Sequence, residues 1–313
     1  MHRPIMSTGM HSSLFGAATP PALFRKLRKY LRPAATLAIF GIVMAGATAH
    51  AETISERIKR GEPIRQAVAN DSPFGYSGPD GKVIGIEVEL VERILHDMGA
   101  KVEVTSTTFG ALIPGIQAGR FDIASDGIYI RPERCRVADF STPDFMIGAG
   151  AFVRKGNNSI HANTMEALAR DHALRFGKLT GGQEDKAFAV AGGDTSQIAN
   201  FTDRVSLTAA VKSNRIDVGL LSALGAAAAV ANDDGLQLIT PLKPPMQNGK
   251  PFVYYAGFGF PKNDLAFEAE FNSRLKAIIQ SPDYVKLLAK YHVPADVVPS
   301  TDVDVAALCN GQP

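Results

Sequence analysis

The feature that most constrains the fold is an alternation of short strand-like segments with helical segments, beginning near residue 63. PIRQAVAN, KVEVTST and RFDIAS have the short, partly apolar pattern of strands. FGALIPGIQAG predicts a short helix before the third strand. IEVELVERILHDMGA predicts a longer helix before the second strand, with five apolar side chains on one face: Val88, Val91, Ile94, Leu95 and Met98. This β-α-β-α-β order predicts an open α/β sheet, because each helix must bury its apolar face against the strands.

The second half of the chain repeats this organisation. Residues 155–250 contain strand patterns at ALRFGKL and RIDVGLL, with paired glycines and a helical segment between them. FVYYAGFGF then predicts one strand that returns to the first sheet, and two helical patterns close the chain. We therefore predict a hinge-linked α/β fold with two lobes. The first lobe comprises residues 52–153 and 254–313, and the second comprises residues 154–253. In open sheets of this kind, ligands bind beyond the carboxyl ends of the strands.

The N-terminal part of the chain has a different pattern. A basic cluster precedes an apolar run from about Ala34 to Gly46, and the small-residue sequence ATAHA follows. This order predicts a secretory signal peptide over residues 1–51, cleaved after Ala51, and hence a periplasmic protein. The alternative is an uncleaved membrane anchor, which requires a longer run of about 20 apolar residues.

The net charge depends on this segment. The chain carries 33 Lys and Arg against 31 Asp and Glu; residues 1–51 hold six of the basic residues and no acidic residue, which leaves 27 against 31. The remaining chain is therefore mildly acidic. A weakly acidic chain without a basic patch argues against a nucleic-acid partner.

The cysteines and histidines suggest a disulfide and no metal. In an oxidising compartment, the pair Cys135 and Cys309 favours one disulfide, although the spacing also permits two free thiols. The histidines after residue 51 lack metal-ligand spacing; they are His96, His161, His172 and His292. The chain contains no GxSxG, HExxH or P-loop motif. We therefore predict no cofactor.

Several segments, taken in order, resemble the polar amino-acid family of periplasmic solute-binding proteins of ABC importers. They are DSPFGY, DGKVIGIEVELVERIL, FGALIPGIQAGRFDIA and IYIRPERCRVADFS, and the likeness continues through RIDVGLL to LLAKYHV. Within the family, LIPG, RPERC and the paired glycines are most like the ectoine and hydroxyectoine binders. The resemblance implies a two-lobed type II periplasmic-binding-protein fold and a role that is not enzymatic.

By this resemblance, Arg134 binds the carboxylate of the ligand. A guanidinium can donate two parallel hydrogen bonds to a carboxylate. The alternative is a surface arginine paired with Glu133 or Asp139. The chain also departs from ordinary amino-acid binders. It has Tyr129 where they usually carry Thr or Ser, and Ser222 where they carry the Asp that holds the α-ammonium group.

The altered positions resemble those of ectoine binders. In these proteins an acidic residue and three aromatic residues surround a delocalised cation, and the matching positions here are Asp71, Phe74, Phe109 and Tyr129. Aromatic faces attract such a cation by roughly 0.5 to 2 kcal/mol for each well-placed contact. The resemblance therefore implies a compact zwitterion, held by Arg134 and Asp71. Asp71 replaces a Glu and Phe109 replaces a Tyr, so another betaine-like or cyclic amino-acid derivative is an alternative ligand. For Phe74 and Phe109 the alternative role is packing within the lobe.

The second lobe is expected to close over the ligand. Gly181, Gly182, Gln183 and Ser222 would complete the cleft from that side, with backbone N–H groups suited to a carboxylate. The glycines could instead serve only the turn from strand to helix. The family implies a monomer that delivers its ligand to a membrane permease driven by an ATPase. Delivery to a chemoreceptor is an alternative role.

An enzyme is the remaining alternative, because a few periplasmic dehydratases resemble the same fold. Catalysis requires a positioned acid or base in the cleft. Asp71 is the only obvious candidate in the sequence, so we expect a binding protein.

Overall fold

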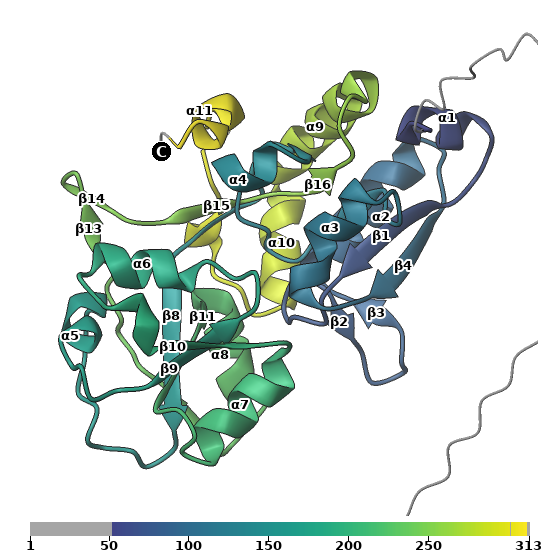
Figure 1. The fold of residues 1–313 in the computed structure, drawn as a ribbon. Coiled ribbons are helices and arrows are strands. Elements are labelled where there is room, and N and C mark those ends of the chain that lie inside the picture. Colours follow the sequence, from purple (N-terminus) through teal and green to yellow (C-terminus); the bar gives the residue numbers. More distant parts are fainter. Residues whose placement is uncertain (1–51, 301, 312–313) are drawn as a thin grey trace, which may run out of the picture. The chain divides into compact units, whose positions relative to one another are not determined.

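The computed structural model describes residues 52–300 and 302–311; the predicted signal peptide, residues 1–51, lies outside the described residues. Two five-stranded sheets organise the described chain (Figure 1). In spatial order, the first sheet contains β4 (Val102–Ser106), β1 (Ile64–Val68), β5 (Ile123–Ala124), β16 (Gly259–Phe260) and β6 (Asp139–Phe140). The second contains β10 (Ile198–Phe201), β9 (Phe176–Leu179), β11 (Val218–Ser222), β8 (Ala149–Arg154) and β12 (Leu236–Leu238). Each sheet with its helices is called a lobe below.

The first lobe has the β-α-β-α-β order expected from the sequence. β1 pairs in parallel with both β4 and β5, so the carboxyl ends of all three strands lie at one edge. The helices of this lobe are α2 (Ile86–Asp97), α3 (Leu112–Gln117), α9 (Leu265–Ile279) and α10 (Pro282–Lys290). Val88, Val91, Ile94 and Leu95 on α2 are buried, which confirms the predicted apolar face.

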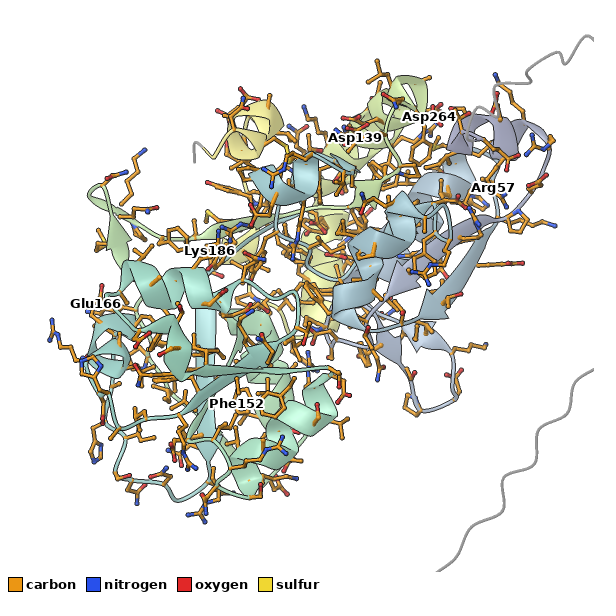
Figure 2. The ribbon with its side chains drawn as sticks, in the orientation of Figure 1. Arg57, Asp139, Phe152, Glu166, Lys186 and Asp264 are labelled. Carbon is orange, nitrogen blue, oxygen red and sulfur yellow. A yellow bond between two sulfur atoms is a disulfide. The ribbon has the colours of Figure 1, made fainter. Side chains whose placement is uncertain are left out.

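Asp264 joins the two ends of this lobe. Its carboxylate caps α9 by accepting a hydrogen bond from the N–H of Phe267. It also accepts hydrogen bonds from the N–H and the hydroxyl of Ser55, both at 2.8 Å. Ser55 belongs to α1 (Ile54–Lys59), so the first helix is tied to the start of α9 (Figure 2).

The second lobe is built in the same way around β9 and β11. β9 pairs in parallel with β10 and β11, whereas β8 is antiparallel to β11 and β12. Its helices are α5 (Met165–Ala169), α6 (Glu184–Val190), α7 (Arg204–Lys212) and α8 (Ala223–Ala231). Phe152 of β8 is fully buried among these strands (Figure 2). It packs against Gly219 of β11, where a Cβ atom would lie 2.2 Å from the phenylalanine ring.

The chain crosses between the lobes along two adjacent strands. β7 (Phe145–Ile147) and β15 (Tyr254–Ala256) pair antiparallel outside the two main sheets. The prediction of one continuous strand at FVYYAGFGF was wrong, because β15 pairs with β7 whereas β16 pairs in the first sheet. β7 pairs with β15, whereas the next strand, β8, belongs to the second sheet. The predicted division after residue 153 therefore falls near the C-terminal end of β8. The limits of the lobes otherwise remain a prediction.

Short elements complete the described chain. They are β2 (Tyr76–Ser77), β3 (Val83–Ile84), η1 (Phe109–Ala111), α4 (Pro132–Cys135), η2 (Thr195–Gln197), β13 (Met246–Gln247), β14 (Lys250–Pro251), η3 (Ala295–Val297) and α11 (Val305–Cys309). A disulfide joins Cys135 to Cys309, with Cα atoms 5.5 Å apart, and so ties α4 to α11. None of the helices in residues 52–300 and 302–311 has the length and apolar character needed to cross a bilayer.

Candidate ligand-binding site

Loops from the carboxyl ends of strands in both lobes line one small cleft. From the first lobe it is lined by Asp71, Phe74, Phe109, Asp126, Gly127 and Tyr129. From the second lobe it is lined by Leu179, Gly182, Gln183, Glu184, Leu221 and Ser222. These twelve residues are called the cleft below. Seven of the nine ligand-binding residues predicted from the sequence are therefore gathered in one place. The other two, Arg134 and Gly181, contact each other at its margin.

The space enclosed by the cleft is about 20 Å³. A volume of that size holds roughly one water molecule, whereas ligand pockets usually measure about 300 to 1,000 Å³. The conformation described is therefore closed upon its own side chains. A ligand can enter only when side chains move or the lobes separate.

Arg134 spans the gap between the lobes. α4 begins with Pro132 at its first turn, and this short helix directs the arginine inward, where it is buried. Its Nη1 donates to the carbonyl oxygen of Tyr129 at 2.8 Å, and its Nη2 donates to that of Gly181 in the second lobe at 2.9 Å. The guanidinium carbon lies 5.6 Å from the centre of the Phe109 ring. Burial lowers the pKa of Arg134 to about 10, so the group stays charged at neutral pH.

Tyr129 is held by a second tyrosine that the sequence interpretation missed. Its ring stacks on Tyr254 of β15, with centroids 4.1 Å apart and planes parallel within 1°. The Tyr254 hydroxyl donates to the carbonyl oxygen of Gln183 at 2.7 Å and accepts from the N–H of Ala187. Tyr129 lines the cleft and also packs on Tyr254, so the stacking fixes the orientation of the ring at the cleft. The doublet in FVYYAGFGF was the only sequence signal for this partner.

Glu184 is a second residue that the sequence interpretation missed. It is the first residue of α6 and is buried in the cleft. The Tyr129 hydroxyl donates a long hydrogen bond of 3.5 Å to its Oε1. Burial raises the pKa of Glu184, while the nearby cations Lys178 and Arg134 oppose that shift. The cleft thus contains a carboxyl group whose pKa is raised.

Gly181 allows the two lobes to approach closely, whereas Gly182 is packed against its own lobe. Gly181 has a positive φ of 84°, and a Cβ atom there would lie 3.1 Å from the Cα of Gly110 in the first lobe. A Cβ atom on Gly182 would lie 2.6 Å from Glu184 Oε2. Both glycines are therefore explained by backbone geometry and close approach. The prediction that they offer N–H groups to a ligand remains a prediction.

The remaining predicted residues are engaged within the protein. Phe74 is fully buried and packs edge-on against Phe145, with centroids 5.4 Å apart. The Ser222 hydroxyl accepts from the N–H of Gly225 at 3.0 Å and so caps α8. Asp71 forms an ion pair with Arg204, the first residue of α7 in the second lobe. Arg204 was also missed, because nothing in TDRV marks it as a partner of Asp71.

A buried group of carboxylates lies beneath the loop that carries Tyr129. Glu87 on α2 accepts a hydrogen bond from the N–H of Gly127 at 2.9 Å. Burial raises the pKa of Glu87 to about 8, and burial together with the nearby Glu87 raises the pKa values of Asp126 and Asp144. Both carboxylate oxygens of Asp144 are buried without a hydrogen-bond partner among the described residues, as is Oε2 of Glu87, so no ion pair there favours the ionised form of either carboxyl group. A protonated Glu87 therefore supports the loop from below.

Nothing in the part of the chain that the structure describes forms a metal site. No group of three His, Cys, Asp or Glu side chains there is placed to hold a metal ion. The cleft contains three carboxyl groups and three aromatic rings, and two arginines, Arg134 and Arg204, contact its residues. This set suits a small molecule that carries both charges.

Two α/β lobes that enclose charged and aromatic side chains at the carboxyl ends of their strands define a class, the two-lobed type II periplasmic binding proteins. Comparison with known families narrows this class. The pattern of the bacterial extracellular solute-binding proteins, family 3, matches residues 64–294. The chain belongs to this family.

Three known proteins are informative relatives. A probable amino-acid ABC transporter periplasmic-binding protein of Sinorhizobium fredii is 30% identical over 93% of this chain and 97% of its own length. The crystal structure of EhuB in complex with hydroxyectoine superposes with a TM-score of 0.69 and 29% identity, covering 82% of this chain and 96% of EhuB. A cyclohexadienyl dehydratase of Pseudomonas aeruginosa is 26% identical over 61% of this chain and 70% of its own length.

Proposed function

We propose that this protein is the periplasmic binding subunit of an ABC importer and that it binds a compact zwitterion, such as ectoine or hydroxyectoine. One observation carries the proposal. Asp71 and Tyr129 both line the cleft between the lobes, and Arg134 donates a hydrogen bond to the carbonyl oxygen of Tyr129. These three residues are 5 to 63 positions apart in sequence. An anionic, an aromatic and a cationic group at one cleft suit a carboxylate next to a delocalised cation.

The relatives support the transport role and the choice of ligand to different degrees. The Sinorhizobium fredii protein is named as an amino-acid transport protein, which favours import of an amino-acid-like solute. EhuB binds hydroxyectoine, which favours a cyclic zwitterion. A polar amino acid is the alternative ligand. The name of the Sinorhizobium fredii relative and the predicted signal peptide support a periplasmic location.

The closed cleft supports a mechanism in which the lobes separate and close. The enclosed space of about 20 Å³ is too small for any of these ligands. The adjacent strands β7 and β15 are the natural hinge, because both crossings run through them. The closed, ligand-bound form would then dock on a permease whose ATPase drives transport.

A thermal-shift screen of residues 52–313 tests this function. The panel contains ectoine, hydroxyectoine, proline betaine and the polar amino acids. A ligand that binds only the folded protein raises the melting temperature by mass action. A shift with ectoines alone supports the proposal. A shift with arginine or glutamine instead retains the transport role and rejects the zwitterion with a delocalised cation.

Tyr129→Leu is expected to weaken binding of such a zwitterion by about tenfold, because the variant retains apolar volume but loses the aromatic face. Tyr129→Phe is the matched control, since it keeps the ring and removes only the hydroxyl that contacts Glu184. We expect the Phe variant to bind within about twofold of the wild type. Isothermal titration calorimetry measures both affinities. Equal affinities for the Leu and Phe variants would reject the aromatic contribution.

An enzymatic function is the second candidate, and the buried Glu184 is the observation that favours it. Its pKa is raised by burial, as a general acid in a cleft requires. The similarity to a cyclohexadienyl dehydratase makes prephenate and arogenate the substrates to test. Formation of product by the wild type, and its loss in Glu184→Gln, would establish the enzyme. No product with either substrate would exclude this activity.

A further inference from the structure

Arg204 reaches across the cleft from the second lobe to the first. The residue begins α7, directly after Asp203, whose side chain caps the helix. Its Nη2 donates to the carbonyl oxygen of Ser72 at 2.8 Å, and the same guanidinium pairs with the Asp71 carboxylate. The two side chains of the pair are only 15% and 10% exposed. Arg204 therefore neutralises the carboxylate to which the ligand's cation is assigned.

The guanidinium also lies beside the start of α8. A Cβ atom on Gly225 would lie 3.6 Å from Arg204 Nη2 and 3.0 Å from Ser222 Oγ. These distances place the guanidinium in van der Waals range of the first turn of α8. Arg204 thus contacts Asp71, one of the residues that line the cleft, and lies near the start of α8, whose cap Ser222 also lines it.

The chemistry of Arg204 matches that of the proposed ligand. A guanidinium is a planar, delocalised cation, as is a cyclic amidinium. The hydrogen bonding of Arg204 is incomplete, because its Nε is buried without a hydrogen-bond partner among the described residues. A buried donor without a partner weakens the arrangement that contains it. A ligand that satisfies Asp71 more completely can therefore displace the arginine.

On the basis of the proposed function, we propose that Arg204 competes with the ligand's cation for the carboxylate of Asp71. In the closed conformation described, it pairs with Asp71 and holds the lobes together. A zwitterion that brings its own delocalised cation takes over Asp71 and releases Arg204. A simple carboxylate, which has no cation, leaves the pair intact. Arg204 is thus a specificity-determining residue of the cleft.

The affinities of Arg204 variants test this competition. The ligand is whichever zwitterion gives the largest shift in the thermal screen. Arg204→Met removes the charge but retains most of the length, and we expect it to bind the zwitterion about tenfold more tightly than the wild type, because Asp71 then has no internal partner. The affinity of Arg204→Lys, which keeps a point charge, should lie between those of the wild type and Arg204→Met. Arg170→Met is the control, since Arg170 is an exposed cation of the same lobe.

Unchanged or weaker binding by Arg204→Met would overturn the proposal. Weaker binding would show that Arg204 contacts the ligand instead of competing with it. Unchanged binding would show that the ion pair does not oppose the ligand.

A measurement without ligand separates this proposal from the proposed function. Small-angle X-ray scattering gives the radius of gyration of each ligand-free variant. We expect Arg204→Met to be larger than the wild type and Arg170→Met, because the lobes lose an ion pair that holds them together. Equal radii would reject the role of Arg204 in closure, even if no ligand in the panel binds. An increased radius without binding by any ligand would retain that role and reject the proposed function.

Discussion

Arg134→Ala is expected to weaken ligand binding by about 100-fold or more, because a carboxylate enclosed between the lobes would lose its charged partner. The loss of affinity should exceed the loss caused by breaking an ordinary ion pair, for a second reason. Arg134 also donates hydrogen bonds to the carbonyl oxygens of Tyr129 and Gly181, one in each lobe. Its removal therefore weakens the closed form itself. Isothermal titration calorimetry with the best zwitterion measures the effect.

Two controls make this result specific. Arg136→Ala removes an exposed arginine two residues away and should leave the affinity unchanged. Arg134→Lys keeps the charge but loses the planar fork, so we expect an intermediate affinity. If Arg134→Ala bound the ligand as tightly as Arg136→Ala, the carboxylate would be held elsewhere and the proposed orientation of the ligand would be wrong.

The second large effect is expected in the pH dependence of stability, and it arises from Glu87. The pKa of Glu87 in the folded protein is about 8, above its ordinary value of 4.5, because the group is completely buried. The folded state therefore keeps its proton while the unfolded state releases it. The free energy of unfolding should fall as pH rises from about 4.5 to about 8, by up to about 1.4 kcal/mol for each pH unit. Below that window the contribution is fully present.

Glu87→Gln should reduce this dependence. The glutamine amide imitates the protonated carboxyl, because it is uncharged and its oxygen can accept from Gly127 N–H. Some dependence should remain, since the pKa values of Asp126 and Asp144 are also raised. Urea unfolding between pH 5 and 8 measures the slope for each variant. The control is Glu103→Gln, the same change at an exposed position. Equal slopes for wild type and Glu87→Gln would show that Glu87 is ionised in the folded protein.

These two residues illustrate which parts of the site could be predicted. Arg134 was assigned from RPERC and a family resemblance, and the structure places its guanidinium between the lobes. Glu87 was only one polar residue in a helical pattern. Its role depends on Asp144, 57 positions away, and on the loop at Gly127. Local periodicity contains no information about such a partner.

The same contrast applies to the elements of the fold. The helix at IEVELVERILHDMGA and the strand at RIDVGLL follow from local patterns of apolar residues, and both are present as α2 and β11. FVYYAGFGF was read as one strand, because its pattern is continuous along the chain. It forms two strands, because β15 finds its partner in β7 and β16 finds its partner in the first sheet.

The sequence by itself determined the α/β class, the order of the elements and the loops that face the cleft. These properties depend on burial patterns within a few residues and on the rule that parallel strands present their carboxyl ends together. Only the tertiary structure decided which groups meet across the cleft. The carbonyl of Ser72 and the guanidinium of Arg204 are 132 positions apart, and Arg134 donates to the carbonyl oxygen of Gly181 in the other lobe. Such pairs form because two separately folded lobes close upon each other, and closure brings together residues whose local sequences are independent.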